Sequence, residues 1–340
     1  MQNLGKKKVR FSYTRLNQYE NCPYSYKLKY EQGLFIDPPG LAAAFGTALH
    51  KVNEIISNAI IAGKPIPYED LKKDFYEWNI PKKSKYDREG DLFGMDVLAK
   101  KFPKEWNDFN TKSGKSYAVK AREFINDGIY AQERFLQEHP ELELVGVEVA
   151  FEYEYRGYVF AGFIDRLLRY KDDPNHFVVH DIKTKDHPFD EKRDLTTPLQ
   201  FVVYCNALRD KYGADITIDC FYDLPVIQLM QRGGTKGFET RGRKKIDKLL
   251  DGIEDKNFYP NPTPLCYWCS YSNTNPKQPV EGKNLCPYYS MWMPDNHTFD
   301  KKFEWQGADK HEFVMNKFLQ RITEESSISV SKPRRFNFDF

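Results

Sequence analysis

The chain has 340 residues, and its 25 Phe and 22 Tyr supply ample apolar surface for a core, so the composition indicates a globular protein. The 51 Lys and Arg nearly balance the 49 Asp and Glu, so the net charge of +2 gives no global argument for nucleic-acid binding, and any basic footprint must be local. There is no run of 18 apolar residues and no apolar segment behind a charged N-terminus, which argues against a membrane span and a signal peptide and favours a reducing, cytoplasmic location.

Helical patterns dominate the first part of the chain. Residues 11–30 predict two short helices, with Ser12 as the N-cap of the first and Pro23 in the first turn of the second. Residues 41–61 predict a long helix, because apolar residues recur there at helical spacing. Residues from about 64 to 140 indicate a helical insertion, Lys-rich and broken by prolines as far as about residue 116 and helical again after it.

Strand patterns follow the insertion. Residues 144–155 and 158–170 predict two strands joined by a tight hairpin at Arg156-Gly157, and a third strand begins at His176. A helix is expected over 195–213, a further strand over 215–224, and a basic helix that ends near Lys256. Helices before and after a mixed sheet indicate an α/β architecture.

The stretch "HFVVHDIKTKDHP" places two charged side chains at the end of a buried strand. Asp181 and Lys183 are two residues apart, so strand geometry points both to one face. Asp165 lies inside the otherwise apolar neighbouring strand. Adjacent carboxylates repel unless a cation joins them, and Mg²⁺ or Mn²⁺ prefers such oxygen ligands, to which the carbonyl of Ile182 can add. An isolated Asp-x-Lys is more often a solvated turn or an ion pair.

Two helices carry polar residues that fit the same chemistry. His50 follows Gly46 by four residues on the long helix, where a missing side chain permits close approach of a metal or a phosphate backbone beside an imidazole. Gln200 and Tyr204 are four apart on the helix after the third strand, and can hold DNA backbone or the lysine. The alternative for each is an ordinary side chain on a helix surface or in the core.

Taken in chain order, these motifs resemble the RecB-like branch of the PD-(D/E)xK nuclease superfamily, and are similar to CRISPR-associated RecB-like iron–sulfur nucleases. The matching stretches, between about Ser12 and Tyr289, are "GTALH" with His50, "GFIDRL" with Asp165, "DIK" with Asp181 and Lys183, and "QFVVY" with Gln200 and Tyr204. The usual Pro-Asp of the superfamily is Ile164-Asp165 here, and its usual Glu is Asp181.

The resemblance implies a restriction-endonuclease-like core, with a mixed central sheet flanked by helices, and the activity of a metal-dependent deoxyribonuclease. It implies Mg²⁺ or Mn²⁺ held by His50, Asp165, Asp181 and the Ile182 carbonyl, with Lys183 catalytic. Gln200 and Tyr204 join the catalytic set, and Glu148 on the preceding strand is an outer-sphere acid. The nuclease domain is expected over residues 1–295, followed by a C-terminal helix and tail over 296–340.

Four of the six cysteines have the spacing of a metal site. Cys266 and Cys269 form a Cys-x-x-Cys pair, Cys286 follows 17 residues later, and Cys22 would join the chain's beginning to its end. The set looks like the [4Fe–4S] site of many RecB-like nucleases, with an inserted loop before the last cysteine, and Zn²⁺ is the alternative. Cys205 and Cys220 are expected to be buried thiols.

The predicted function is phosphodiester hydrolysis in DNA, by an exonuclease acting on single strands or ends in recombination, repair or DNA processing. The alternative is a catalytically idle iron–sulfur DNA-binding subunit of a recombination or CRISPR-adaptation complex, and a third is a zinc-stabilised interaction protein. No "GxxxxGK[ST]" motif is present, so any ATP-driven unwinding must come from a helicase or recombination partner. The tail, with Phe336, Phe338 and Phe340 alternating, either packs on the nuclease or is a docking peptide.

Overall fold

The computed structural model describes residues 9–35, 40–77, 94–108 and 114–261, together with 266, 269–271, 286, 292–293 and 298–299. The chain divides into two compact units, Met1–Ser12 with Pro39–Arg243 and Tyr13–Pro38 with Lys244–Phe340. The expected C-terminal helix and the phenylalanine-bearing tail lie outside the described residues. None of the helices in the described ranges is both long and apolar enough to cross a membrane.

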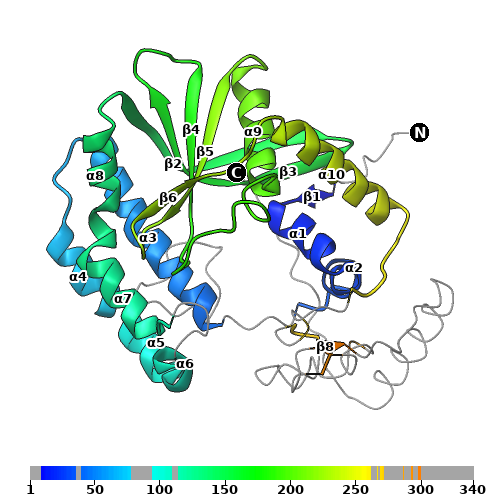
Figure 1. Cartoon of the computed structure of the whole chain (residues 1–340), viewed down its shortest axis with the longest axis horizontal. Coiled ribbons are helices and arrows are strands. Elements are labelled where there is room, and N and C mark those ends of the chain that lie inside the picture. The colour runs from blue at the N-terminus through cyan, green and yellow to red at the C-terminus, as the bar shows by residue number, and fades with distance from the viewer. Residues whose placement is uncertain are drawn as a thin grey trace, which may run out of the picture. The chain divides into compact units, whose positions relative to one another are not determined.

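The first unit is built on a six-stranded mixed sheet (Figure 1). Its strands are β1 (Arg10–Phe11), β2 (Leu142–Tyr155), β3 (Tyr158–Tyr170), β4 (His176–Ile182), β5 (Thr217–Leu224) and β6 (Leu229–Arg232). The order is β1-β3-β4-β5-β6, with β2 paired to β3. The β1–β3 and β4–β5 pairs are parallel, whereas β2–β3, β3–β4 and β5–β6 are antiparallel. The mixed sheet flanked by helices that the sequence predicts is therefore confirmed.

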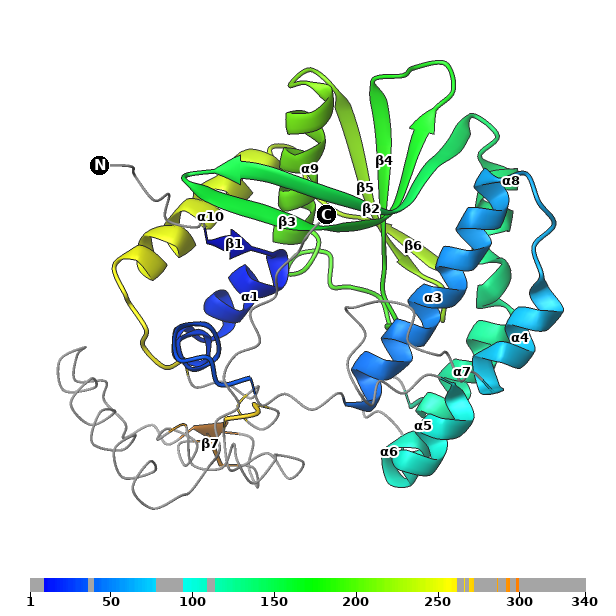
Figure 2. The same ribbon diagram turned by 180° about the vertical axis from the view of Figure 1, so that it is seen from behind.

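Helices cover both faces of this sheet. The helices are α3 (Leu41–Ile61), α4 (Tyr68–Glu77), α5 (Met95–Lys101), α6 (Pro103–Asn107), α7 (Tyr117–Asn126), the 3-10 turn η2 (Gly128–Tyr130), α8 (Ala131–Glu138), α9 (Leu199–Tyr212) and α10 (Phe238–Glu254). Figures 1 and 2 show α3, α7 and α8 on one side of the sheet and α9 on the other. An apolar core lies on each side, one built around α3 and one around α9.

The hairpin between β2 and β3 is confirmed at Arg156-Gly157. Both residues have positive φ, 50° and 78°, which is the geometry that matches the twist of two paired strands. Tyr155 pairs with Tyr158 directly across the turn. This short connection fixes the register of the two longest strands, and that register positions the site described below.

The structure differs from the sequence-based expectation in three elements. Strands β1 and β6 were not predicted, because two and four residues carry too little pattern to be distinguished from loop. The expected helix over residues 117–140 breaks after Asn126. At the break, Gly128 packs so close to the Pro225 carbonyl that a Cβ there would lie 2.3 Å from its oxygen, so a tertiary contact and not local propensity ends the helix.

The second unit contains the N-terminal helices. These are α1 (Tyr13–Asn21), α2 (Pro23–Tyr26) and the π-turn η1 (Lys27–Glu31), and a short antiparallel pair, β7 (Trp292–Met293) with β8 (Thr298–Phe299), lies further along the chain. The segment after α10 binds the N-terminal helices through main-chain atoms. Tyr19 Oη donates to the Asn257 carbonyl at 2.9 Å, and the Tyr24 amide donates to the Tyr259 carbonyl at 3.0 Å. The two expected short helices are thus confirmed.

Candidate active site

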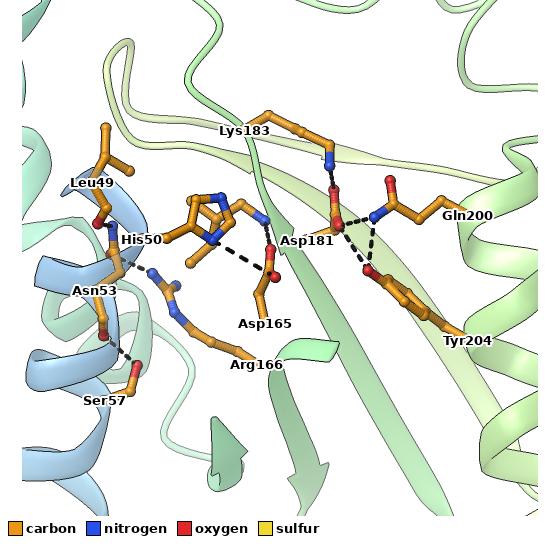
Figure 3. A network of polar contacts seen from close by, with 11 residues as sticks. Leu49, His50, Asn53, Ser57, Asp165, Arg166, Asp181, Lys183, Gln200 and Tyr204 are labelled. Carbon is orange, nitrogen blue, oxygen red and sulfur yellow. Dashed lines mark hydrogen bonds and ion pairs between the residues drawn. The ribbon is translucent and has the colours of Figure 1, made fainter. Parts of the chain in front are cut away.

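The site lies where strands β3 and β4 separate (Figure 3). Their ladder of paired residues ends at Arg166 and His180. Two residues further along β4, the Ile182 N–H lies beyond this ladder and donates to Asp165 Oδ2 at 2.6 Å. The carboxylate of Asp165 therefore replaces a sheet hydrogen bond, and it holds the end of β4 at a defined distance from β3.

Two further ligand groups converge on Asp165. His50, from α3, has Nδ1 at 3.8 Å from Asp165 Oδ1. Glu148 lies opposite Asp165 on the hairpin, between the pairs Val147–Arg166 and Val149–Ile164. One ligand atom from each of His50, Glu148 and Asp165 lies within 4.8 Å of the others, which is close enough to share one metal ion.

Glu148 has a backbone conformation unusual for a strand residue. Its φ is +46°, in the left-handed region that residues other than glycine rarely adopt. The sequence reasoning gave Glu148 only an outer role, whereas the structure places it with His50 and Asp165. The signal that could have found it is the hairpin turn, because Glu148 precedes Arg156 by eight residues and Asp165 follows Gly157 by eight.

Asp181 is the centre of a second group of contacts. Lys183 Nζ lies 2.5 Å from Asp181 Oδ2. Gln200 Nε2 donates to Asp181 Oδ1 at 2.6 Å, and Tyr204 Oη donates to the same oxygen at 3.2 Å. In the structure the side chains of Gln200 and Tyr204 fix the orientation of Asp181, and the expectation that they hold DNA or the lysine stays a prediction (Figure 3).

Main-chain groups complete the arrangement around Ile182. Its main chain lies near the His50 imidazole and raises the pKa of that ring, although burial outweighs this effect. The amide of Lys183 donates to the Asp223 carbonyl on β5 at 2.8 Å, which continues the parallel pairing of β4 with β5 one residue beyond the strand. The structure thus brings His50, Asp165, Ile182, Asp181 and Lys183 to one end of the sheet.

The electrostatics of the site disfavour bare carboxylates. Burial, with the charge of Asp165 adding to it, raises the pKa of Glu148 to about 7. Burial also raises the pKa of Asp181 to about 6, although Lys183 opposes this shift. Burial raises the pKa of Asp165 and lowers the pKa of the His50 imidazole. A divalent cation bound here would favour the ionised acids and the neutral imidazole, because both are the metal-binding forms.

A buried arginine lies next to the site and contacts the elements that carry its residues. Arg166, the residue after Asp165, is 1% exposed. Its guanidinium donates to Asp223 Oδ2 at 2.8 Å and to Asn53 Oδ1 at 2.6 Å, and Asn53 lies one turn after His50 on α3 (Figure 3). Arg166, Asp223 and Asn53 were not predicted from the sequence as part of the site. The only available signal was an arginine inside an apolar strand, which requires buried partners that the sequence alone does not identify.

The cysteines separate into two groups. In the second unit, Cys22, Cys269 and Cys286 pack around Tyr24, Leu28 and Tyr271. The Cys269 amide donates to the Cys266 carbonyl at 3.2 Å, which brings that pair close together, and the Asn261 amide donates to Cys22 Sγ at 3.5 Å. In the first unit, Cys205 and Cys220 are buried in the core around α9 with their sulfurs 3.8 Å apart, as expected of structural thiols.

Comparison with known proteins assigns the chain to a family. No curated protein matches it significantly in sequence. Among the solved structures that match is one from Eubacterium rectale described as a "Putative exonuclease", with 14% identity, a TM-score of 0.42, and coverage of 82% of this chain and 96% of that one. The family model described as the PD-(D/E)XK nuclease superfamily matches residues 10–274. This match spans most of the chain, and the protein therefore belongs to the PD-(D/E)XK nuclease superfamily.

Proposed function

We propose that the protein is a divalent-metal-dependent DNA nuclease of the RecB-like branch, similar to the CRISPR-associated RecB-like enzymes, which hydrolyses phosphodiesters in single-stranded or end-bearing DNA. The observation that carries this proposal is the convergence of His50, Glu148 and Asp165 within 4.8 Å, beside the ion pair of Asp181 and Lys183. An exonuclease of this kind would serve recombination, repair or DNA processing. ATP-driven unwinding of a duplex would have to come from a helicase partner, because the sequence contains no P-loop motif.

The donor set fits Mg²⁺ or Mn²⁺. Hard cations take carboxylate and carbonyl oxygens, which Asp165, Asp181, Glu148 and the Ile182 carbonyl supply, and the imidazole of His50 favours Mn²⁺ over Mg²⁺. A bound cation would supply Lewis-acid stabilisation of the phosphate charge and would acidify a water ligand. Each residue then has a role that follows from its position.

Lys183 is the residue we assign to charge stabilisation. Its ammonium group is held 2.5 Å from Asp181, so it stays at the rim of the metal site with a fixed orientation. Hydrolysis adds the oxygen of water to phosphorus while the bond from phosphorus to the leaving oxygen breaks. Negative charge grows on the non-bridging oxygens during this step, and a preoriented ammonium group stabilises it. Gln200 and Tyr204 act indirectly, since they orient Asp181.

The cysteines support a [4Fe–4S] cluster as a structural cofactor of the second unit. Cys22, Cys269 and Cys286 share one apolar environment, and Cys266 accepts a main-chain hydrogen bond from Cys269. Four thiolates and an apolar surrounding fit an iron–sulfur cluster, and they also fit Zn²⁺. The cluster would hold the chain's beginning to its later part and has no step in hydrolysis.

The test is cleavage of end-labelled linear and circular DNA, single- and double-stranded, with Mg²⁺ or Mn²⁺. We expect metal-dependent cleavage that Asp165→Asn and Asp181→Asn abolish. Lys183→Met should lower kcat by about 10²–10³-fold, the usual loss when one charge-stabilising group is removed. The asparagine at position 165 can still accept from the Ile182 amide, so this variant removes the charge and keeps the fold.

The matched control is Asp219→Asn. Asp219 is also a strand aspartate in ion pairs, with His176 and Arg232, but it lies on β5 away from the metal ligands. This variant should cleave like the wild type. Full activity of Asp181→Asn would contradict the assigned site. DNA binding without cleavage under any metal would favour the alternative, a catalytically idle DNA-binding subunit.

A further inference from the structure

An exposed aromatic ring lies beside the candidate metal site. Phe163 is two residues before Asp165 on β3, and successive residues of a strand face opposite sides of a sheet, so the two side chains share one face. Their Cα atoms are about 7 Å apart in extended geometry. Phe163 is 53% exposed, whereas Phe160 on the same strand is fully buried.

The register of the hairpin shows why Phe163 is not part of the core. The opposite face of β2 and β3, with Val149, Phe151 and Ile164, packs against α9. On the face of Phe163, α3 covers the end that holds Glu148 and Asp165. Beyond that end, Phe163 pairs with the exposed Ala150, whose methyl group is too small to cover a ring.

Figure 2 shows the hairpin running on from α3 toward β1. Among the residues that the structure describes, the Phe163 ring is thus an exposed side chain on the strand that carries Asp165. Single exposed apolar residues are common on protein surfaces, so exposure alone does not mark a site. The position does, because a nucleic-acid strand with its phosphate at Asp165 has a neighbouring nucleotide within reach of Phe163, two residues away on the same face of β3.

We propose that Phe163 is a stacking platform for an unpaired nucleobase of the nucleotide next to the scissile phosphate. This inference rests on the proposed nuclease function and names the form of its substrate. Aromatic side chains on exposed sheet faces bind single-stranded nucleic acid by stacking on the bases, with little dependence on sequence. A base inside a duplex has both faces covered by its neighbours, so Phe163 selects single strands, overhangs or frayed ends.

The first experiment compares Phe163→Ala, Phe163→Leu and Phe163→Trp on a single-stranded oligonucleotide and on a blunt duplex. Loss of one aromatic stacking partner should raise KM and Kd for the single strand by about 5- to 150-fold in Phe163→Ala. The leucine variant keeps apolar volume without a π face and should also bind weakly, whereas tryptophan should bind as well as the wild type or better. Mn²⁺ affinity, measured by calorimetry, should be unchanged in all three.

The matched control is Tyr212→Ala. Tyr212 is another exposed aromatic residue of the same unit, 42% exposed, at the C-terminal end of α9, whereas Gln200 lies at the N-terminal end. This variant should keep the KM of the wild type. If Phe163→Ala also keeps it, or loses single-strand and blunt-duplex binding equally, the stacking proposal is wrong.

A second experiment identifies the partner base. In a series of oligonucleotides, each with one abasic nucleotide, the wild type should lose affinity at one position next to the cleaved bond. Phe163→Ala should show no additional loss at that position, because the stacking contact is already absent. Additive losses would overturn the proposal. Binding is read by anisotropy without cleavage, so a protein that fails to cleave DNA would contradict the proposed function and still report on Phe163.

Discussion

Glu148 and Asp165 face each other on the two strands of one hairpin, where Asp165 is buried and Glu148 is half-buried. Two acids at such positions cost free energy when both are ionised. The pKa of Glu148, raised to about 7, expresses this cost. A divalent cation removes it, so the metal-free and the metal-bound protein should respond to pH in opposite ways.

The residue-scale prediction concerns this response. An acid with a folded-state pKa near 7 and an unfolded-state value near 4.5 binds more protons when folded, so its contribution to stability is present at low pH and is lost as pH rises through about 7. Asp181, with a pKa of about 6, acts in the same direction. In EDTA, Tm should therefore fall between about pH 5.5 and about pH 8 through these groups. Saturating Mn²⁺ should raise Tm more at the higher pH, because protons no longer compete for the ligands.

Glu148→Gln provides the control for this measurement, by scanning calorimetry with EDTA or Mn²⁺. The amide cannot ionise, so the variant should lose less stability with rising pH than the wild type in EDTA. It should also gain less from Mn²⁺, since one charged ligand is missing. If Mn²⁺ raises the Tm of the wild type equally at both pH values, Glu148 is not a ligand of the metal site.

At this scale the sequence predicts most of the site residues, but it does not predict the buried side chains that hold them in position. His50, Asp165, Asp181 and Lys183 could be grouped because each is a polar residue in an apolar pattern, and the pattern resembles a family. Their partners are set by tertiary packing. Nothing in the one-dimensional pattern joins Arg166 to residues 113 positions before it and 57 positions after it.

The elements meet at the guanidinium of Arg166. Asn53 belongs to α3, one turn beyond His50, and Asp223 belongs to β5, where its carbonyl also accepts from the Lys183 amide. One side chain thus fixes the helix that carries His50 relative to the strands that carry Asp165 and Lys183. Such a network affects catalysis through position, because small displacements of reacting groups lower rates strongly.

The element-scale prediction compares Asn53→Ala with Ser57→Ala. Both side chains are buried on α3, but Asn53 accepts from Arg166, whereas Ser57 contacts the Asn53 carbonyl and Gln132. Each variant should lose about 1–3 kcal/mol of stability by leaving a buried polar partner unpaired. Only Asn53→Ala should also lower kcat, by about tenfold or more, with KM for DNA nearly unchanged. The readouts are denaturant unfolding and steady-state kinetics, and an equal fall in kcat in both variants would show a general loss of folding instead.

Short elements and helix breaks could not be predicted for a related reason. β1 exists because β3 offers an unpaired edge at Val159 and Phe160, where β4 no longer pairs with it. The break at Gly128 exists because Pro225 approaches it. By contrast, the hairpin at Arg156-Gly157 was predictable, since its backbone preference is local. Local preferences therefore fixed the long elements, and tertiary contacts fixed the rest.

At the scale of the whole molecule, the cysteines join distant parts of the sequence. Cys22 lies in the same apolar cluster as Cys269 and Cys286, although more than two hundred residues separate them. The second unit also has hydrogen bonds to main-chain carbonyls between residues near 20 and residues near 260, with side-chain donors from Tyr19 and Asn261 and a main-chain donor from Tyr24. A four-thiolate cofactor would add a covalent link to these weak contacts, and its binding free energy would become folding free energy of this unit.

The last prediction tests this link. Protein purified without oxygen should be brown and contain about four irons per chain, the content of a [4Fe–4S] cluster. Cys22→Ser should lose iron, colour and thermal stability together, whereas Cys205→Ala, a buried thiol of the other unit, should keep the iron and lose only the stability expected of a small core cavity. If metal analysis finds one zinc and no iron per chain, the four cysteines hold zinc instead of a cluster, and the link between distant parts of the sequence is retained. Iron retained in full by Cys22→Ser would show that the N-terminal cysteine is not a ligand, and that hydrogen bonds and apolar packing join these segments without it.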